Sequence, residues 1–275
     1  MTDDNPYGYS PLGGEILSKG KDHEDGKENV ELPDLKESFS VGPYNPEAGV
    51  QSTLFPFSNT LDSYQGKDGD NQSKIILNNF DVASIAYYKE MEKFAEKILE
   101  AFAMTLSLPP YWFKSMTNKH CSALRIINYP HISSPGDFPE NQVRASAHTD
   151  YGVITILRQD PSPGSLQVIH RQTGEWIPVQ YIEDAYVINL GDLMARWTND
   201  QWVSTMHRVV KPPLENEEES RRQSFAFFHN LNKTAMVETI PTCVDAQHPA
   251  KYPPINAMDH LMEKHLASTS GVAMK

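Results

Sequence analysis

The stretch Ala147-His148-Thr149-Asp150-Tyr151-Gly152-Val153-Ile154-Thr155-Ile156-Leu157 decides the fold of this chain. It places a histidine and a carboxylate two positions apart, just before a run of β-branched and aliphatic residues. In a strand, residues i and i+2 project to the same side. An extended segment here would therefore aim His148 and Asp150 at one point, and the run after Gly152 predicts a β-strand.

Two later segments carry complementary groups. His207 lies in Val-Ser-Thr-Met-His-Arg-Val-Val, a second β-rich run, and Arg222 and Ser224 alternate along a third. Two imidazoles and one carboxylate form the ligand set of non-haem iron(II) centres that keep open coordination positions. A guanidinium fork matches a carboxylate in bidentate geometry, and a neighbouring hydroxyl adds a donor. The pattern predicts a metal site beside a carboxylate-binding pair.

Each of these residues also has a simpler interpretation. His-x-Asp alone is a weak signal, and the three ligand candidates could be unrelated surface residues. Arg222 and Ser224 could form a polar pair on an edge strand, with Arg221 the solvent-exposed arginine. Asn189 and Asp192, in Asn-Leu-Gly-Asp, are typical of a capped strand-to-turn junction. The order and shared context of the segments favour the metal site.

Composition narrows the class of protein. The chain has 275 residues, 39% of them hydrophobic, and a formal net charge of −12. This acidity argues against a nucleic-acid groove and against an anionic membrane surface. Two cysteines make no disulfide framework, and there is no apolar run long enough to span a membrane. We expect a cytoplasmic protein with reduced thiols.

The chain divides by composition into four parts. Residues 1–75 are polar and predict an extended, partly flexible segment, with 19–31 nearly all hydrophilic. Residues 76–117 predict helical support. Residues 118–233 contain short, evenly spaced β runs, which favour a double-stranded β-helix (a jelly-roll, cupin-like core) with flanking helices. Residues 234–275 predict a segment with a final helix over 256–266.

The helical part has recognisable limits. Asp81 is the expected N-cap, Leu108-Pro109-Pro110 ends the helix, and a short second helix is expected over 111–116. An apolar stripe at helical spacing should pack against the sheet; it comprises Met91, Phe94, Ala95, Ile98, Leu99, Phe102 and Leu106. The β runs are expected at 124–129, at 166–170 and 175–179 as a hairpin, and at 186–190, with an acidic linker over 212–220.

The ordered motifs Ala-His-Thr-Asp-Tyr-Gly, Asn-Leu-Gly-Asp, Ser-Thr-Met-His-Arg-Val and Arg-Gln-Ser resemble the isopenicillin N synthase-like family of 2-oxoglutarate/Fe(II)-dependent oxygenases. The resemblance runs from about residue 8 to 266. It implies iron ligation by His148, Asp150 and His207, and 2-oxoglutarate binding by Arg222, Ser224 and Tyr129. Many plant members carry an asparagine two residues before that tyrosine; here the position is Ile127. By proximity, the candidate substrate-pocket residues are Tyr151, Asn128, Leu124 and Phe228.

The resemblance implies a dioxygenase, an oxidoreductase that hydroxylates a small organic metabolite. Its cofactors would be Fe(II), 2-oxoglutarate as co-substrate and O2, with ascorbate as reductant; succinate and CO2 would be released. Two alternatives remain open: a co-substrate-free iron oxidase of the same fold, and a non-catalytic relative with a binding or regulatory role. The partner expected is a small-molecule substrate, not a nucleic acid or a membrane. Because family members usually carry a longer N-terminal segment, self-association through the surface it would cover is a further expectation.

Overall fold

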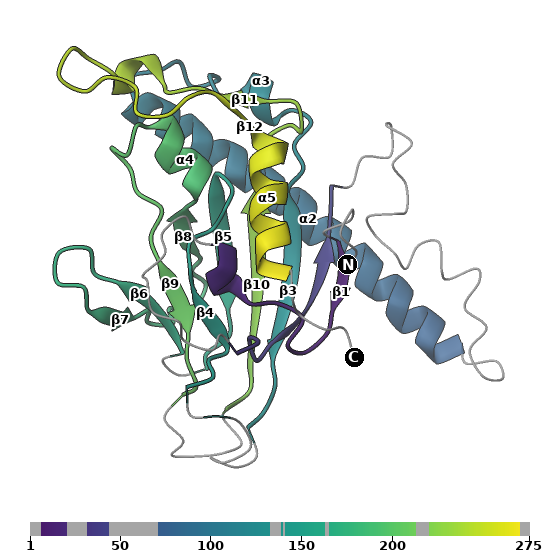
Figure 1. Cartoon of the computed structure of the whole chain (residues 1–275). Coiled ribbons are helices and arrows are strands. Elements are labelled where there is room, and N and C mark those ends of the chain that lie inside the picture. Colours follow the sequence, from purple (N-terminus) through teal and green to yellow (C-terminus); the bar gives the residue numbers. More distant parts are fainter. Residues whose placement is uncertain are drawn as a thin grey trace.

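Two antiparallel sheets face each other in the computed structural model, which describes residues 7–20, 32–43, 71–132, 139, 141–162, 165–212 and 220–269. Their strand orders are β1-β2-β3-β10-β5-β8 and β4-β9-β6-β7 (Figure 1). This arrangement is the predicted jelly-roll core. The expected linker over 212–220 and the hydrophilic stretch 19–31 lie mostly outside the described residues.

The six-stranded sheet presents different side chains on its two faces because strands alternate. In its central strand, β10, Arg222, Ser224 and Ala226 are buried toward the other sheet, whereas Phe227 packs outward against Tyr88, with ring centroids 5.1 Å apart. The strands are β1 (Gly8–Ser10), β2 (Glu37–Val41), β3 (Ala123–Tyr129), β10 (Arg222–His229), β5 (Ile154–Gln159) and β8 (Val187–Leu190).

The four-stranded sheet brings distant histidines together. His148 at the end of β4 is the register partner of His207 at the start of β9, and the register is irregular between Ala145 and His148. The expected hairpin is confirmed, with Gly174 at a φ of +70° in its turn. The strands are β4 (Ala145–His148), β9 (His207–Val209), β6 (Leu166–Ile169) and β7 (Trp176–Pro178).

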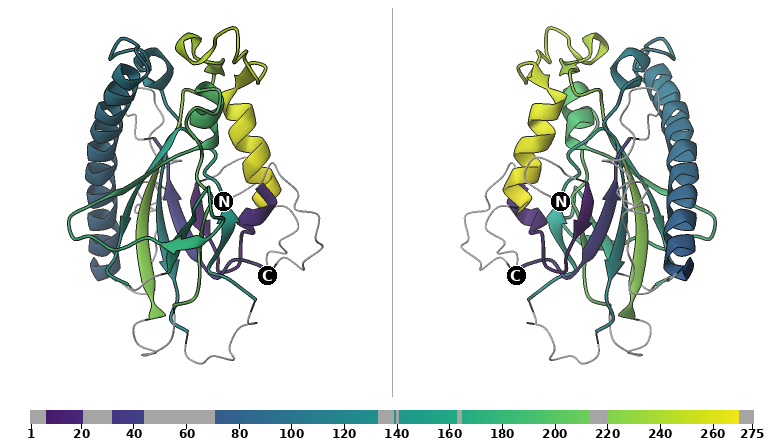
Figure 2. Two further views of the ribbon diagram at one scale, coloured as in Figure 1. Left: turned by 90° about the vertical axis from the view of Figure 1, so that its left-hand side faces the viewer. Right: turned by 90° about the vertical axis from the view of Figure 1, so that its right-hand side faces the viewer.

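One long helix, α2 (Asn71–Thr105), covers the outer face of the six-stranded sheet (Figure 2). Its expected stripe packs on that face; Phe94, the most exposed member, contacts Tyr186. The prediction that Asp81 caps this helix is wrong, because the helix begins ten residues earlier, at Asn71. Residues 71–80 contain neither glycine nor proline, so nothing in them stops the helix from extending toward the N-terminus.

The remaining elements pack around the two sheets. The last helix, α5 (Ala257–Thr269), lies beside η1 (Leu17–Gly20), and the backbone N–H of Ile16 donates to the Ser268 carbonyl at 2.9 Å (Figures 1 and 2). The others are α3 (Lys114–Thr117), α4 (Asp192–Trp197), η4 (Pro241–Cys243), and the pair β11 (Met236–Val237) and β12 (Ile255–Asn256).

Two apolar clusters stabilise this arrangement. The larger lies between α2 and the six-stranded sheet and includes Tyr88, Leu99 and Phe227. The smaller lies between the two sheets and includes Ile127, Leu166 and Val209. Buried polar side chains, among them His148, Asp150 and Arg222, also lie between the sheets.

Composition predicts a boundary between an extended first part and a helical part at residue 75. Position 75 falls inside α2, and residues 8–10 and 37–41 of the first part form strands of the six-stranded sheet.

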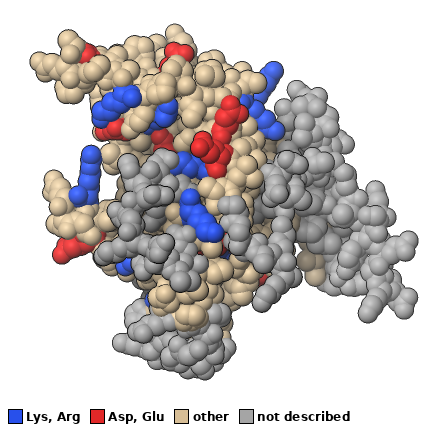
Figure 3. Space-filling view, in the orientation of Figure 1, with Lys and Arg blue, Asp and Glu red and all other residues tan. Residues whose placement is uncertain are grey.

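Among the described residues, no helix has the length and apolar character needed to cross a membrane. On the face shown in Figure 3, basic and acidic side chains of the described residues are interspersed.

Candidate active site

The three predicted metal ligands meet between the sheets. Asp150 Oδ1 lies 3.9 Å from His148 Nε2 and 3.7 Å from His207 Nε2, and the imidazole centroids are 4.3 Å apart. One ligand atom from each residue lies within 4.8 Å of the other two. The structure places Asp150 just beyond the end of β4 rather than within it, yet the carboxylate still reaches the histidines. This geometry suits a single metal ion.

Both imidazoles are oriented by backbone carbonyls. Nδ1 of His148 donates to the Ser146 carbonyl at 2.7 Å, and Nδ1 of His207 donates to the Thr205 carbonyl at 3.0 Å. A carbonyl accepts only, so each Nδ1 carries a proton, and each Nε2 is directed at the site. Burial, with a further contribution from the His207 imidazole, lowers the pKa of His148 to about 3. This histidine is therefore neutral, as a metal ligand must be.

The Asp150 carboxylate is held by two side chains of the six-stranded sheet. Thr155 Oγ1 and Asn189 Nδ2 both donate to Oδ2 at 2.6 Å, which leaves Oδ1 facing the histidines. Burial by itself raises the pKa of Asp150, but His207, His148 and these two hydrogen bonds together hold it below its ordinary value. The sequence interpretation of Asn189 as a turn cap missed this contact, because only the β5–β8 pairing brings it to Asp150.

The predicted carboxylate-binding residues lie on the opposite wall, on β10 and β3. Arg222 is 2% exposed, its Nη1 donates to Ser224 Oγ at 3.3 Å, and its Cζ lies 4.9 Å from the centroid of the Tyr129 ring. Its Nη2 has no hydrogen-bond partner, and no carboxylate of the described residues pairs with it. A buried guanidinium of this kind is costly unless an anion satisfies it. The carboxylate of a 2-oxo diacid fits this requirement.

A second buried arginine, which the sequence interpretation did not single out, strengthens this positive region. Arg144, 1% exposed, donates from Nη2 to the carbonyls of Pro130 and Ser220. Burial, followed by repulsion from the Arg222 guanidinium, lowers the pKa of Arg144 to about 10. The two neighbouring positive charges favour an anion at this end of the site.

A cavity of about 210 Å³ joins the metal triad to Arg222. Two of the predicted pocket residues, Tyr151 and Phe228, line it. The other two predictions, Asn128 and Leu124, are wrong. Alternation along β3 turns Tyr129, Ile127 and Arg125 inward, so residues 124 and 128 point the other way. Leu124 accordingly packs in the outer core, and Asn128 Nδ2 donates to Glu37 at 2.8 Å.

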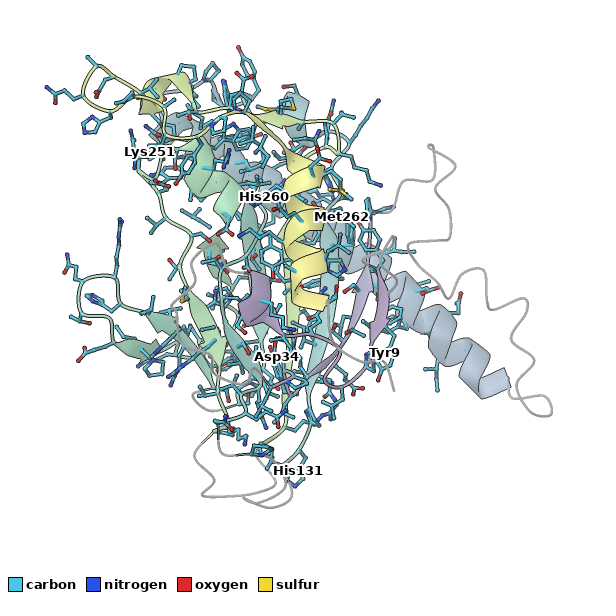
Figure 4. All side chains as sticks on the ribbon, in the orientation of Figure 1. Tyr9, Asp34, His131, Lys251, His260 and Met262 are labelled. Atoms are coloured by element: carbon cyan, nitrogen blue, oxygen red, sulfur yellow. The ribbon has the colours of Figure 1, made fainter. Side chains whose placement is uncertain are left out.

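Helix α5 supplies a wall of the cavity that the sequence interpretation also missed. Met258, Leu261, Met262 and His265 line the cavity at helical spacing, and Figure 4 labels Met262 on this helix. Lys264 Nζ lies 3.7 Å from Asp192 Oδ2, an oxygen that also accepts a hydrogen bond from Thr149 at 3.2 Å. Asp192 thus links α5 to Thr149, the residue between His148 and Asp150. The spacing of apolar residues in this segment predicts a helix, but it does not show that the apolar face lines the cavity.

Known proteins match both the sequence and this architecture. A sequence profile described as the 2OG-Fe(II) oxygenase superfamily matches residues 121–231. A 2-oxoglutarate-Fe(II) type oxidoreductase of Emericella nidulans is 35% identical over 92% of this chain and 66% of that protein. One of Metarhizium rileyi is 31% identical over 97% of this chain and 71% of that protein. The chain therefore spans about two thirds of the length of these relatives.

Solved structures agree with the sequence relatives. A full-length Neurospora crassa protein in complex with alpha-KG has a TM-score of 0.76 and 30% identity, covering 97% of this chain and 75% of that chain. The same protein with alpha-KG and thymine also gives 0.76. The narrower likeness to isopenicillin N synthase stays a prediction. These sequence and structural matches show that this chain belongs to the 2OG-Fe(II) oxygenase superfamily.

Proposed function

We propose that this chain is a 2-oxoglutarate-dependent Fe(II) dioxygenase that oxidises a small organic molecule. One observation carries the proposal. Within one cavity, a His-Asp-His set faces an arginine whose Nη2 has no hydrogen-bond partner. When bound, Fe(II) with 2-oxoglutarate would supply the oxidising chemistry, in which O2, the co-substrate and a substrate C–H bond give succinate, CO2 and a C–OH group.

The residues of the chain would bind and orient the reactants. His148, Asp150 and His207 would hold the metal through Nε2, Oδ1 and Nε2. Arg222 and Ser224 would bind the distal carboxylate of 2-oxoglutarate, with the Tyr129 ring packed on the guanidinium. The inter-sheet cluster, including Leu166, Val209 and Ala226, would exclude water from the chain of the co-substrate.

The substrate would occupy the part of the cavity bounded by Tyr151, Phe228 and the inner face of α5. The dimensions of the cavity support a small metabolite rather than a polymer. The similar Neurospora crassa protein has been solved with thymine and with 5-formyluracil, so a substrate screen should begin with these compounds and other small ring compounds. Two buried free cysteines, Cys121 and Cys243, support a reducing, cytoplasmic location.

The test has two stages. Anaerobic addition of 2-oxoglutarate to the Fe(II)-loaded protein should produce a visible absorbance band, and its absence would favour a co-substrate-free oxidase. Succinate release with Fe(II), ascorbate and 2-oxoglutarate should then increase with the correct substrate. A His207→Ala variant should lose both signals, and full turnover by this variant would overturn the assignment of His207 as a ligand. Purified protein that is folded but binds neither metal nor 2-oxoglutarate would favour a non-catalytic role.

A further inference from the structure

The segment that precedes β2 reaches the metal site through a short hydrogen-bonded path. We propose that Asp34 is a positioning residue for the metal: it fixes Ser146, whose carbonyl orients the His148 imidazole. This inference rests on the proposed function, because it concerns the residue that would present Nε2 to iron. It adds a residue far from the ligand motif in sequence to those that determine the geometry of the site.

Three hydrogen bonds define the path. Asp34 Oδ1 accepts from the backbone N–H of Ser146 at 2.8 Å and from its hydroxyl at 2.6 Å. The carbonyl of Ser146 accepts from His148 Nδ1 at 2.7 Å. One carboxylate oxygen therefore holds both the backbone and the side chain of the residue that orients the ligand.

The irregularity in β4 explains why a carboxylate is needed there. The pairing with β9 is regular at Ala145 and at His148 but shifts register between them. Such a bulge disrupts the ladder and leaves backbone groups without their usual partners. The Ser146 N–H finds its partner in Asp34 instead of in a strand. The position of the Ser146 carbonyl thus depends on Asp34.

Asp34 is itself held from several sides. Its Oδ2 accepts from the backbone N–H of Leu17 at 3.3 Å and lies 3.7 Å from Lys36 Nζ. Lys36 pairs with Glu15 at 2.9 Å, and Glu15 pairs with Arg125 at 3.0 Å. Figure 4 labels Asp34 just below η1, the element that contains Leu17. The carboxylate has little freedom to move without disturbing this network.

The burial of these charges indicates a role in position rather than in stability. Asp34 is fully buried, and Lys36 and Glu15 are 5% and 3% exposed. Burying ion pairs costs desolvation energy, and apolar residues of similar volume are often equally stabilising. Glu15, Lys36 and Arg125 also line the cavity that contains the triad. The network therefore joins the cavity wall to the support of His148.

Metal affinity of the full chain tests the proposal. Apo protein prepared with a chelator would be titrated anaerobically with Co(II), following the ligand-field absorption. In Asp34→Ala both acceptor contacts to Ser146 are removed, so the affinity should fall about 10- to 100-fold, as is typical when a partner of a ligand is lost, and the band should shift. In Ser146→Ala the effect should be smaller, because the backbone N–H still donates. Asp245→Ala is the matched control: Asp245 also accepts backbone bonds, from Gln247 and His248 at 2.7 Å, but in an exposed turn.

The outcomes separate this proposal from the proposed function. Unchanged affinity and spectrum in Asp34→Ala, with a melting temperature like that of the wild type, would overturn the positioning role. If Asp34→Ala does not fold, Ser146→Ala decides: a wild-type spectrum and affinity would overturn the proposal, and a shifted band with weaker binding would support it. A wild-type chain that binds no Co(II) or Fe(II) would overturn the proposed function itself.

Discussion

Asn189 donates from Nδ2 to Oδ2 of Asp150 at 2.6 Å, so that β8 of one sheet orients a carboxylate that faces histidines of the other. The same oxygen also accepts from Thr155. Both acceptor positions of Oδ2 are thereby used, and Oδ1 is left toward His148 and His207. Both sheets therefore contribute to the metal site: the four-stranded sheet carries the two histidines, and the six-stranded sheet orients the carboxylate.

Asn189→Ala should weaken metal binding about 10- to 100-fold, because the loss of a hydrogen-bonded partner of a ligand typically has that effect. The carboxylate would remain attached through Thr155 but could rotate. Isothermal titration of the apo protein with Co(II) measures the change. Asn232→Ala is a suitable control, since Asn232 also makes side-chain hydrogen bonds, to Ser115 and Asn118, away from the cavity. Equal affinities in wild type and Asn189→Ala would show that Asn189 does not orient Asp150.

Arg222→Lys should raise the 2-oxoglutarate concentration needed for half saturation by roughly 10- to 100-fold. Lysine keeps the charge but cannot form the planar fork, and a hydrogen bond to a charged group contributes about 1.5–3 kcal/mol. The absorbance band that forms on anaerobic addition of 2-oxoglutarate provides the titration. Metal affinity should stay near that of the wild type.

The adjacent arginine provides the control for this substitution. Arg221 is exposed, and its Nε donates to Asn128 Oδ1 at 3.1 Å on the other face of β10. Arg221→Lys should leave the 2-oxoglutarate titration unchanged. If the two variants behave alike, Arg222 does not bind the co-substrate.

The sequence allowed the triad and Arg222 to be predicted because their chemistry requires particular residue types at strand spacing. His148 and His207 meet as register partners across β4 and β9, which strand alternation and the order of the motifs could anticipate. Alternation also explains an error. Proximity to the ligand residues suggests Leu124 and Asn128, but both lie at odd-numbered separations from Tyr129 and so face the opposite side of β3.

Other features depended on long-range packing that no local pattern encodes. In the sequence, Asn189 is typical of a turn cap, and only the pairing of β8 with β5 brings it to Asp150. Asp34 lies more than 100 positions from Ser146, the residue it holds. The amphipathic spacing of α5 is visible in the sequence, but the cavity beneath its apolar face is not. Similarly, nothing in residues 71–80 distinguishes a helical start from a polar loop except the absence of glycine and proline.

Gly191→Ala should destabilise the fold by roughly 1–3 kcal/mol, the usual range for overpacking. A Cβ at this position would lie 2.2 Å from the Gly152 carbonyl oxygen and 3.0 Å from that of Asp150, and both are backbone atoms that cannot rotate away. Chemical denaturation measures the change. Gly174→Asn is the control, because a Cβ there meets nothing within 4 Å and asparagine tolerates positive φ. A loss of stability in Gly174→Asn as large as that in Gly191→Ala would rule out the proposed steric cause.

The buried imidazole of His229 should make stability fall on acidification. Its Nδ1 lies 3.1 Å from Ser122 Oγ, and its ring packs against His120, which pairs with Glu92, and against Phe227. Burial, and then the charge of His120, lowers the pKa of His229 to about 3. An unfolded histidine binds a proton near pH 6.5. Between these values the unfolded chain holds one more proton, so stability is complete above pH 6.5 and is lost as the pH falls toward 3.

Replacing His229 isolates this contribution. His229→Asn keeps a polar group near Ser122 but does not titrate, so its free energy of unfolding should depend less steeply on pH between about 6 and 4. The expected difference from the wild type is about 1.4 kcal/mol per pH unit. Chemical denaturation of both apo proteins in the presence of chelator measures this difference. His148 is present in both proteins, so its titration does not contribute to the difference. His248→Asn serves as control, because His248 is exposed beside Asp245. Parallel pH profiles for wild type and His229→Asn would show that His229 becomes protonated in the folded protein as readily as in the unfolded chain.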